Sequence, residues 1–234
     1  MKHIKLIILV SVLVAVINAS AQTERAISYF QSSTLAYGPL VGGLLQFGSN
    51  NTQVTNKHLE KQPRSGVCMG AVVSLRKSSW LLESGFEFSK DGYKYNVSQD
   101  PEFPLPAHVS SENHNISFHS FSVPLRAVYS FSSFRLRSMI AIGVVPQLLT
   151  KVIHHQTVHY DEGSTVSNVY NEKYRYNSIY PAVTLGYVVE YDIDQTVALR
   201  LEPQIKFSLL PAKDSNYSTS INAFSLRLSL LLFN

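Results

Sequence analysis

The chain carries little charge for its length. Only 15% of its 234 residues are Asp, Glu, Lys or Arg, whereas a soluble domain averages about 25%. Aromatic residues, at 11%, are too frequent for a solvated, disordered chain. The formal net charge of +4 is too small to indicate a surface that binds nucleic acid. Composition therefore argues for a folded protein whose surface is unusually apolar and has no nucleic-acid partner.

Long apolar runs and cysteine pairs are also missing. Hydrophobic residues make up 45% of the chain, yet beyond the N-terminal region none of the apolar stretches approaches the roughly 18 residues of a membrane-spanning helix. Cys68 is the single cysteine, so a disulfide within the chain is excluded. The sequence contains no Gly-rich phosphate loop and no cysteine motif for a metal, and we expect no cofactor.

The first 21 residues have the pattern of a secretory signal peptide. Lys2 and Lys5 precede the apolar run 6–17, and Ala19 and Ala21 supply the small residues of a cleavage site. A single N-terminal membrane anchor is the alternative, although the apolar run is short for a span. We predict cleavage after Ala21, a short extension over 22–32 and one domain over 33–234.

The remaining chain alternates between apolar and polar residues with a period of two. This period is typical of strands with two different faces. In the clearest segment, Leu199 and Leu201 alternate with Arg200 and Glu202. Such segments lie at 35–49, 67–76, 80–89, 121–131, 134–144, 179–191, 197–208 and 224–232. We predict an all-β protein built from eight antiparallel strands.

The connections between these segments are alternately long and short. Residues 50–65, 91–114, 153–174 and 210–222 form long polar connections, whereas 76–79, 132–133 and 192–195 are tight turns. An up-and-down transmembrane β-barrel has this pattern, because its outer loops are long and its periplasmic turns are short. Across the turns we expect Tyr129 to pair with Leu136. By the same test, Leu75 pairs with Trp80 and Tyr191 with Val197.

The apolar face of such a barrel could point inward, as in a soluble lipocalin-like carrier, or outward toward lipid. The apolar side chains are far more numerous than the roughly twelve that fill a narrow barrel core, so we expect them to face lipid. The opposite face is rich in Gly and Ser and carries charges of both signs. We predict a self-neutralising lumen network of Glu83, Glu87, Arg126, Arg135, Arg137, Glu190, Arg200, Glu202, Lys206 and Arg227.

Four prolines lie inside the predicted strands: Pro124, Pro146, Pro181 and Pro203. Proline lacks the N–H that a strand donates to its neighbour, and a closed barrel has no free edge where this loss is harmless. We therefore expect each of these prolines at a bulge or above the bilayer.

Several short strings resemble a known family. They are Ser20-Ala21-Gln22 at the end of the signal, Ser122-Val123-Pro124-Leu125, Ile142-Gly143-Val144-Val145-Pro146, and the terminal Leu232-Phe233-Asn234. The chain resembles the PorT-like outer-membrane β-barrel family of Gram-negative bacteria from about residue 33 to its end. The resemblance implies an eight-stranded barrel in the outer membrane. It also implies that Phe233 is the assembly signal read by the barrel-assembly machinery.

Two groups of residues suggest other chemistry. His154, His155 and His159 could bind a metal, but they lie at the start of a long polar loop, where we expect them to be solvated, and have no carboxylate or cysteine at ligand spacing. Ser117 and His119 share one strand face, as a nucleophile and base would in a lipid hydrolase, but no orienting acid is identifiable. Glu83 and Glu87 lie about 13 Å apart on a strand, which is too far for a glycosidase pair.

We therefore predict a non-enzymatic integral outer-membrane protein. Its exposed loops would serve binding, adhesion or envelope structure. Outer-membrane lipid surrounds it, and the extracellular partner is not identified by the sequence. The alternatives are an outer-membrane hydrolase that modifies lipid and a soluble, exported ligand carrier.

Overall fold

A computed structural model describes residues 34–51, 60–98, 105–106, 108–132, 135–210 and 218–234. The predicted signal peptide (1–21) and extension (22–32) lie outside these residues. Within the described ranges, no helix is long and apolar enough to span a membrane.

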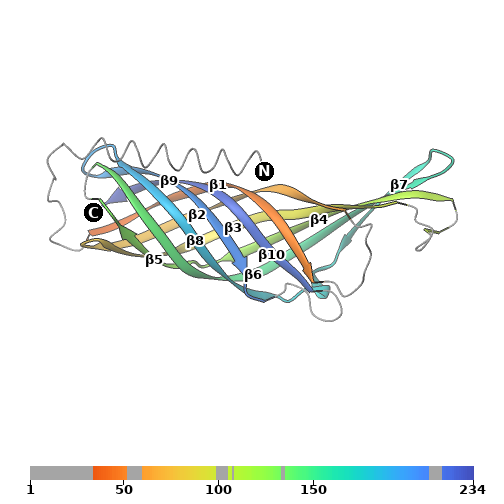
Figure 1. Cartoon of the computed structure of the whole chain (residues 1–234), viewed down its shortest axis with the longest axis horizontal. Helices are drawn as coiled ribbons and strands as arrows, with labels where there is room; N and C mark the ends of the chain where they lie inside the picture. Colours follow the sequence, from red (N-terminus) through yellow and green to blue (C-terminus); the bar gives the residue numbers. More distant parts are fainter. Residues whose placement is uncertain (1–33, 52–59, 99–104, 107, 133–134, 211–217) are drawn as a thin grey trace.

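The described chain is almost entirely β-structure (Figure 1). Its elements are β1 (Thr34–Asn51), β2 (Glu60–Lys77), β3 (Trp80–Ser98), β4 (Val109–Ser122), β5 (Leu125–Ser130), β6 (Leu136–Tyr160), β7 (Thr165–Asn171), the 3-10 turn η2 (Lys173–Arg175), β8 (Ile179–Asp192), β9 (Val197–Ser208) and β10 (Ser218–Phe233). Every strand pair is antiparallel.

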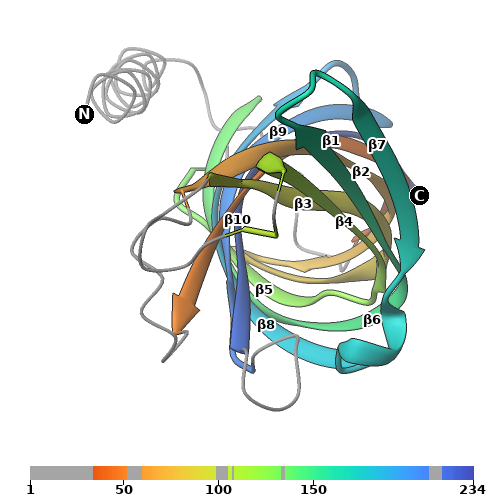
Figure 2. The same cartoon turned by 90° about the vertical axis from the view of Figure 1, so that its right-hand side faces the viewer.

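The strands close into a ring, as Figure 2 shows. β1 pairs with β2 on one side and with β10 on the other, so the first and last strands seal the barrel. β4 and β5 occupy one position, because both lie between β3 and β6. The ring thus has eight strand positions, in the order β1, β2, β3, β4 with β5, β6, β8, β9, β10. The predicted eight-stranded antiparallel barrel is confirmed.

Of the four prolines, Pro124 lies between two strands, whereas Pro146, Pro181 and Pro203 lie inside β6, β8 and β9. Pro124 separates β4 from β5, and the N–H of Val123 donates to the carbonyl of Pro146 at 3.2 Å. The missing N–H of Pro146 therefore points toward this break. Pro146 and Pro181 face each other in register. Beside Pro203, the ladder between β8 and β9 is interrupted. Only Pro124 breaks a strand outright.

The short turns have registers different from those expected. Tyr129 pairs with Ile140 rather than Leu136. Leu75 pairs with Leu82 rather than Trp80, and Tyr191 pairs with Leu199 rather than Val197. The turn between β5 and β6 is longer than predicted, whereas the turn between β2 and β3 is shorter. Every shift of register is nevertheless an even number of residues. Because an even shift keeps each side chain on the same face, the division into two faces survives the error.

Two of the predicted long loops are largely strand. β3 continues to Ser98, and β4 begins at Val109, so most of 91–114 is paired. β6 continues to Tyr160 and forms a hairpin with β7, within the predicted loop 153–174. These extensions project from the end of the barrel opposite the short turns (Figure 1). We call the two ends the turn end and the projecting end. The paired parts of β3, β4, β6 and β7 beyond the barrel form the projecting sheet.

The outer face of the barrel is apolar and the inner face is polar. On β9, Leu199 and Leu201 are 41% and 43% exposed, whereas Arg200 and Glu202 are each 1% exposed. Exposed aromatic rings, Trp80 among them, lie beside the turns, as in the aromatic girdles of membrane barrels. The apolar belt between the two ends is the surface expected to contact lipid.

Substitutions at Leu201 test the assignment of the two faces. Leu201 lies within the apolar belt between Leu228 and Val189 on the neighbouring strands. An arginine at mid-membrane on the lipid face costs about 2–4 kcal/mol. Leu201→Arg should therefore strongly reduce the barrel recovered folded in the outer membrane, and Leu201→Val should not. The readout is the heat-modifiable band in unheated detergent gels. Equal recovery of Leu201→Arg and parent would contradict a lipid-facing position.

Candidate functional site: a charged lumen beneath a projecting sheet

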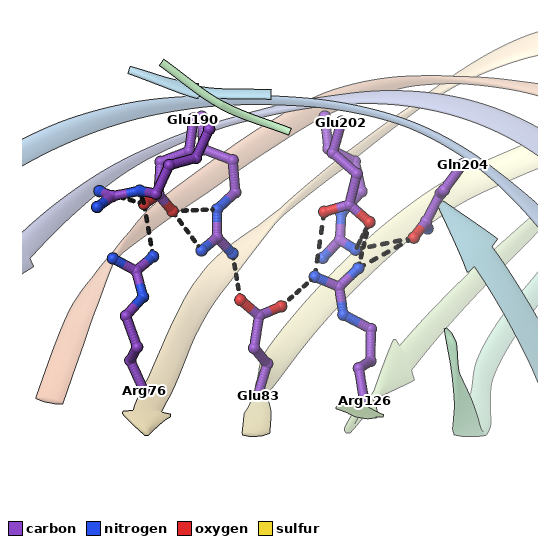
Figure 3. A network of polar contacts seen from close by, with 9 residues as sticks. Arg76, Glu83, Arg126, Glu190, Glu202 and Gln204 are labelled. Carbon is purple, nitrogen blue, oxygen red and sulfur yellow. Dashed lines mark hydrogen bonds and ion pairs between the residues drawn. The ribbon is translucent and has the colours of Figure 1, made fainter. Parts of the chain in front are cut away.

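Buried ion pairs cross the lumen of the barrel (Figure 3). Glu83 on β3 accepts hydrogen bonds from Arg126 on β5, at 2.5 Å, and from Arg200 on β9. β3 and β9 lie opposite each other in the ring, so the contact between Glu83 and Arg200 spans the full width of the lumen. A single carboxylate thus joins three strand positions.

Glu190 on β8 forms a second centre nearer the turn end. Its carboxylate lies 2.6 Å from Arg76, 2.7 Å from Arg137 and 2.6 Å from Arg200. Arg76 comes from β2, which is opposite β8 in the ring. Three guanidinium groups therefore surround one carboxylate that is completely buried. Arg137 also pairs with Asp192 at the end of β8.

Glu202 on β9 continues the network toward the projecting end. It pairs with Arg126 and lies 3.7 Å from Arg227. Arg227 also lies 3.1 Å from Glu87, and it donates a hydrogen bond of 3.0 Å to Gln204. These contacts link β3, β5, β9 and β10, as Figure 3 shows in part.

The charges in this network balance. Its five guanidinium groups face five carboxylates: Arg76, Arg126, Arg137, Arg200 and Arg227 with Glu83, Glu87, Glu190, Glu202 and Asp192. A charge buried without a partner costs several kcal/mol, so pairing is what makes this interior stable. Side chains that meet across the lumen fill the space that an open channel would need.

The structure buries every predicted lumen charge except Arg135, which is exposed. The cause is the longer turn before β6, which places Arg135 outside the strand. Lys206 lies toward the projecting end and donates to Gln147 at 2.8 Å. Arg76 and Asp192 belong to the network but were not predicted. Arg76 could have been found from its alternation with Ser74, which is also buried.

From the ion pairs toward the projecting end, the inside of the barrel contains first a cluster of aromatic side chains and then a pair of histidines. Tyr93, Phe118, Tyr176 and Tyr180 belong to one buried apolar cluster. Beyond it, His114 Nδ1 lies 2.9 Å from His154 Nε2. Glu112 lies 3.1 Å from His114, and Glu172 lies 3.2 Å from His154. The four polar side chains come from β4, β6 and the segment before η2.

This arrangement corrects the expectation for the histidines. His154, His155 and His159 belong to β6 rather than to a solvated loop. His154 is buried against His114, whereas His155 on the next position is exposed. Among the described residues, no group of three or more His, Cys, Asp or Glu side chains is arranged to hold a metal ion.

Phe233, the predicted assembly signal, lies at the turn end. It packs against the buried cluster of Ala36, Val72, Ala198 and Leu231. The guanidinium of Arg76 lies 5.6 Å from the centroid of its ring. Phe233 therefore points to the interior side of β10, and the exposed Leu232 beside it points outward.

The sequence pattern of the outer membrane protein beta-barrel domain family matches residues 20–212. The chain belongs to this family. A member of this outer membrane barrel family is a bacterial outer-membrane protein, and this location fits the apolar belt and the charged lumen. A soluble carrier is thereby excluded. No curated protein sequence matches the chain.

Several solved structures are similar to this outer membrane barrel at low sequence identity. Neisserial surface protein A has 9% identity and a TM-score of 0.46, with 86% of this chain and 99% of that chain covered. OprG from Pseudomonas aeruginosa has 7% identity and a TM-score of 0.48, with 88% and 97% covered. Ail of Yersinia pestis, solved with the heparin analogue sucrose octasulfate, has 8% identity and a TM-score of 0.35, with 86% and 99% covered.

The possible hydrolase pair is not assembled as a nucleophile and base. Ser117 and His119 both lie on β4 of the barrel. The Ser117 hydroxyl accepts a hydrogen bond of 2.5 Å from Arg64. Within the described ranges, Ser117 makes no hydrogen bond with His119.

Removing one central carboxylate tests the lumen network. Glu83→Gln would leave Arg126 and Arg200 without full compensation, and breaking a buried pair typically costs about 3–5 kcal/mol. We expect the free energy of unfolding, measured by urea titration of the refolded barrel, to fall by that order. Glu162→Gln is the matched control, because Glu162 is exposed at the tip of the β6–β7 hairpin. Equal stability of both variants would contradict the role of Glu83.

The histidine pair predicts acid sensitivity of the projecting sheet. Burial, together with the neighbouring His154, lowers the pKa of His114, although Glu112 and Glu172 oppose this. The unfolded state then binds the proton more tightly, so the stabilisation is complete above the ordinary histidine pKa of about 6.5. It is lost as the pH falls below that value. Hydrogen exchange of residues 111–117 should accelerate there. His114→Gln should remove this dependence, and His155→Gln on the opposite face should keep it.

Proposed function

We propose that the protein is a non-enzymatic outer-membrane barrel that binds a partner at the cell surface through its projecting sheet. The supporting observation is the continuation of β3, β4, β6 and β7 beyond the apolar belt. A barrel whose only task was to occupy the membrane would not need paired strands of this length. Long loops of membrane barrels lie outside the cell, so we expect the projecting sheet to be accessible to a partner there.

The outermost strand of the sheet is suited to recognition. Among the described residues, β7 pairs only with β6, so its other edge carries unpaired backbone groups. A partner strand can add to such an edge through main-chain hydrogen bonds. Val166, Val169 and Tyr170 on β7 are 44%, 62% and 45% exposed. Exposed apolar side chains beside an open edge favour binding or adhesion over a purely structural role.

The lumen and the serine support the non-enzymatic part of the proposal. Buried ion pairs bridge the lumen, and Ser117 is engaged by Arg64. A role in protein secretion, which is associated with the PorT-like family, is not part of the proposal. We also propose that, within the outer membrane barrel family, the chain is PorT-like.

Adhesion of intact cells tests this function. Cells that produce the parent protein or Val166→Thr/Val169→Thr would be applied to surfaces coated with collagen, fibronectin, laminin or heparin. We expect at least one surface to retain parent cells, and we expect the double variant to lose most of this retention. Ile193→Thr is the matched control, because Ile193 is exposed in a turn at the opposite end.

Two outcomes would contradict the proposal. The first is equal retention of parent cells and cells without the protein on every surface. The second is a change in the lipid A profile of the host that the parent causes and Ser117→Ala abolishes, which would indicate the hydrolase instead.

A further inference from the structure

A polar groove lies on the outer surface of the barrel, just beyond the apolar belt. It has a volume of about 470 Å³ and is formed by β2, β3, β4 and β6. Its lining includes Arg64, Lys90, Lys94, Asn115 and His155, and no residue of the lining is acidic. The groove is distinct from the lumen network, because the lumen charges point to the other face of the same strands.

The strand register places the lower edge of the groove directly above the lipid-facing surface. Phe88 on β3 pairs with Phe121 on β4, and their ring centroids are 5.0 Å apart. Two residues further along β3 on the same face, Lys90 pairs with His119, which pairs in turn with Lys151 on β6. On the outer face, the row of basic side chains is thus directly next to the row of aromatic side chains along the strands. The basic row therefore begins where the exposed aromatic side chains of β3 and β4 end.

The upper part of the groove holds an arginine in a fixed position. Arg64 on β2 donates hydrogen bonds of 2.5 Å to Asn115 and Ser117 on β4. Gly92 on β3 pairs with Ser117 and lies between the strand of Arg64 and the strand of Asn115 and Ser117. A Cβ at Gly92 would meet the Ile116 carbonyl oxygen at 2.0 Å. The missing side chain at Gly92 therefore allows the backbones of β3 and β4 to approach closely, and Arg64 reaches across this part of β3 to β4.

Among the described residues, the basic side chains of the groove have no acidic partner. Among the residues that the structure describes, Lys90, Lys94 and Lys151 form no ion pair. The positive electrostatic potential of these side chains also acts on His119. Burial lowers the pKa of His119, and Lys90, Lys151 and Arg64 lower it further. Several cations held close together without an acidic partner indicate an anionic ligand.

We propose that this groove binds the phosphate groups of a phosphorylated glycolipid in the outer leaflet of the membrane. Lysines act as point charges toward phosphate, and a positioned guanidinium adds directional hydrogen bonds. Asn115 and His155 offer hydrogen-bonding groups for the sugar. A lipid is favoured over a soluble anion because Lys90 follows the exposed Phe88 directly along the outer face of β3, so that acyl chains could lie along the apolar belt while phosphates meet the lysines. This site is independent of the proposed binding by β7.

Binding of lipid A to the purified full-length barrel tests the proposal. The barrel in zwitterionic detergent would be titrated with lipid A that carries both phosphates, and bound lipid would be measured by native mass spectrometry. Lys90→Gln/Lys94→Gln should weaken binding roughly 30-fold, or about fivefold for each lysine. Lys77→Gln is the matched control, because Lys77 is an exposed lysine at the turn end. It should bind as the parent does.

Two further ligands identify the source of the anion. Lipid A without phosphates has the same sugar and acyl chains but lacks the anionic groups. We therefore expect the parent and the double variant to bind dephosphorylated lipid A equally weakly. Inorganic phosphate should not displace bound lipid at equal concentration. The heat-modifiable band of each variant without lipid confirms that the barrel is folded. If the double variant does not fold, the single change Lys94→Gln gives the same test with a smaller loss.

Three results would overturn the proposal. One is equal binding of phosphorylated and dephosphorylated lipid A by the parent. Another is an equal loss of binding in Lys77→Gln and in the double variant, which would indicate general electrostatic attraction. The third is binding of a soluble sulfated polysaccharide that depends on Lys90 and Lys94 and that phosphorylated lipid A does not compete away.

Discussion

The structure depends on one constraint, namely that neighbouring residues of every barrel strand point to opposite sides of a closed wall. Leu201 and Glu202 are adjacent in the chain, yet one is 43% exposed on the apolar belt and the other is 1% exposed in the lumen. The closed ring leaves no edge on which this division could be relaxed. Each inward charge must therefore find its partner inside the same narrow space. Glu83 and Glu190 satisfy this requirement by reaching strands on the opposite side of the ring.

This constraint explains which features the sequence could predict. The side of the wall that each residue faces follows from a period of two, and it is insensitive to errors of an even number of residues. The register between β5 and β6 differs from the expected one by such an even number, and Arg126 and Arg137 still face the lumen. Arg135 was assigned wrongly because a turn has no period of two. The residue type gives no sign of where a strand ends, so Arg135 was taken as part of the strand.

The strands of the projecting sheet, in contrast, could not be predicted from the sequence. Residues 91–98 and 153–160 are paired strands, but they were predicted as loops. Outside the membrane both faces of a strand can meet water or other polar groups, so the apolar alternation that marks a strand disappears. For the same reason, the buried pair of His114 and His154 could not be predicted, since it is formed between β4 and β6 rather than within either strand. The groove of Arg64, Lys90 and Lys94 likewise could not be predicted, because it is formed where a side chain of β2 reaches across β3 to β4.

The pairing of β1 with β10 has a consequence for the order of assembly. The ring is sealed by the first and the last strand of the barrel, so the wall stays open until the C-terminal strand is in place. Arg200 and Glu202 lie on β9, and Arg227 lies on β10. They are the ion-pair partners of Glu83, Arg126 and Glu87, respectively. Pairing of β9 supplies the partners of Glu83 and Arg126, and closure by β10 supplies Arg227, the partner of Glu87. A chain that lacks its last strand would therefore keep an open edge and would also lack the cation that faces Glu87.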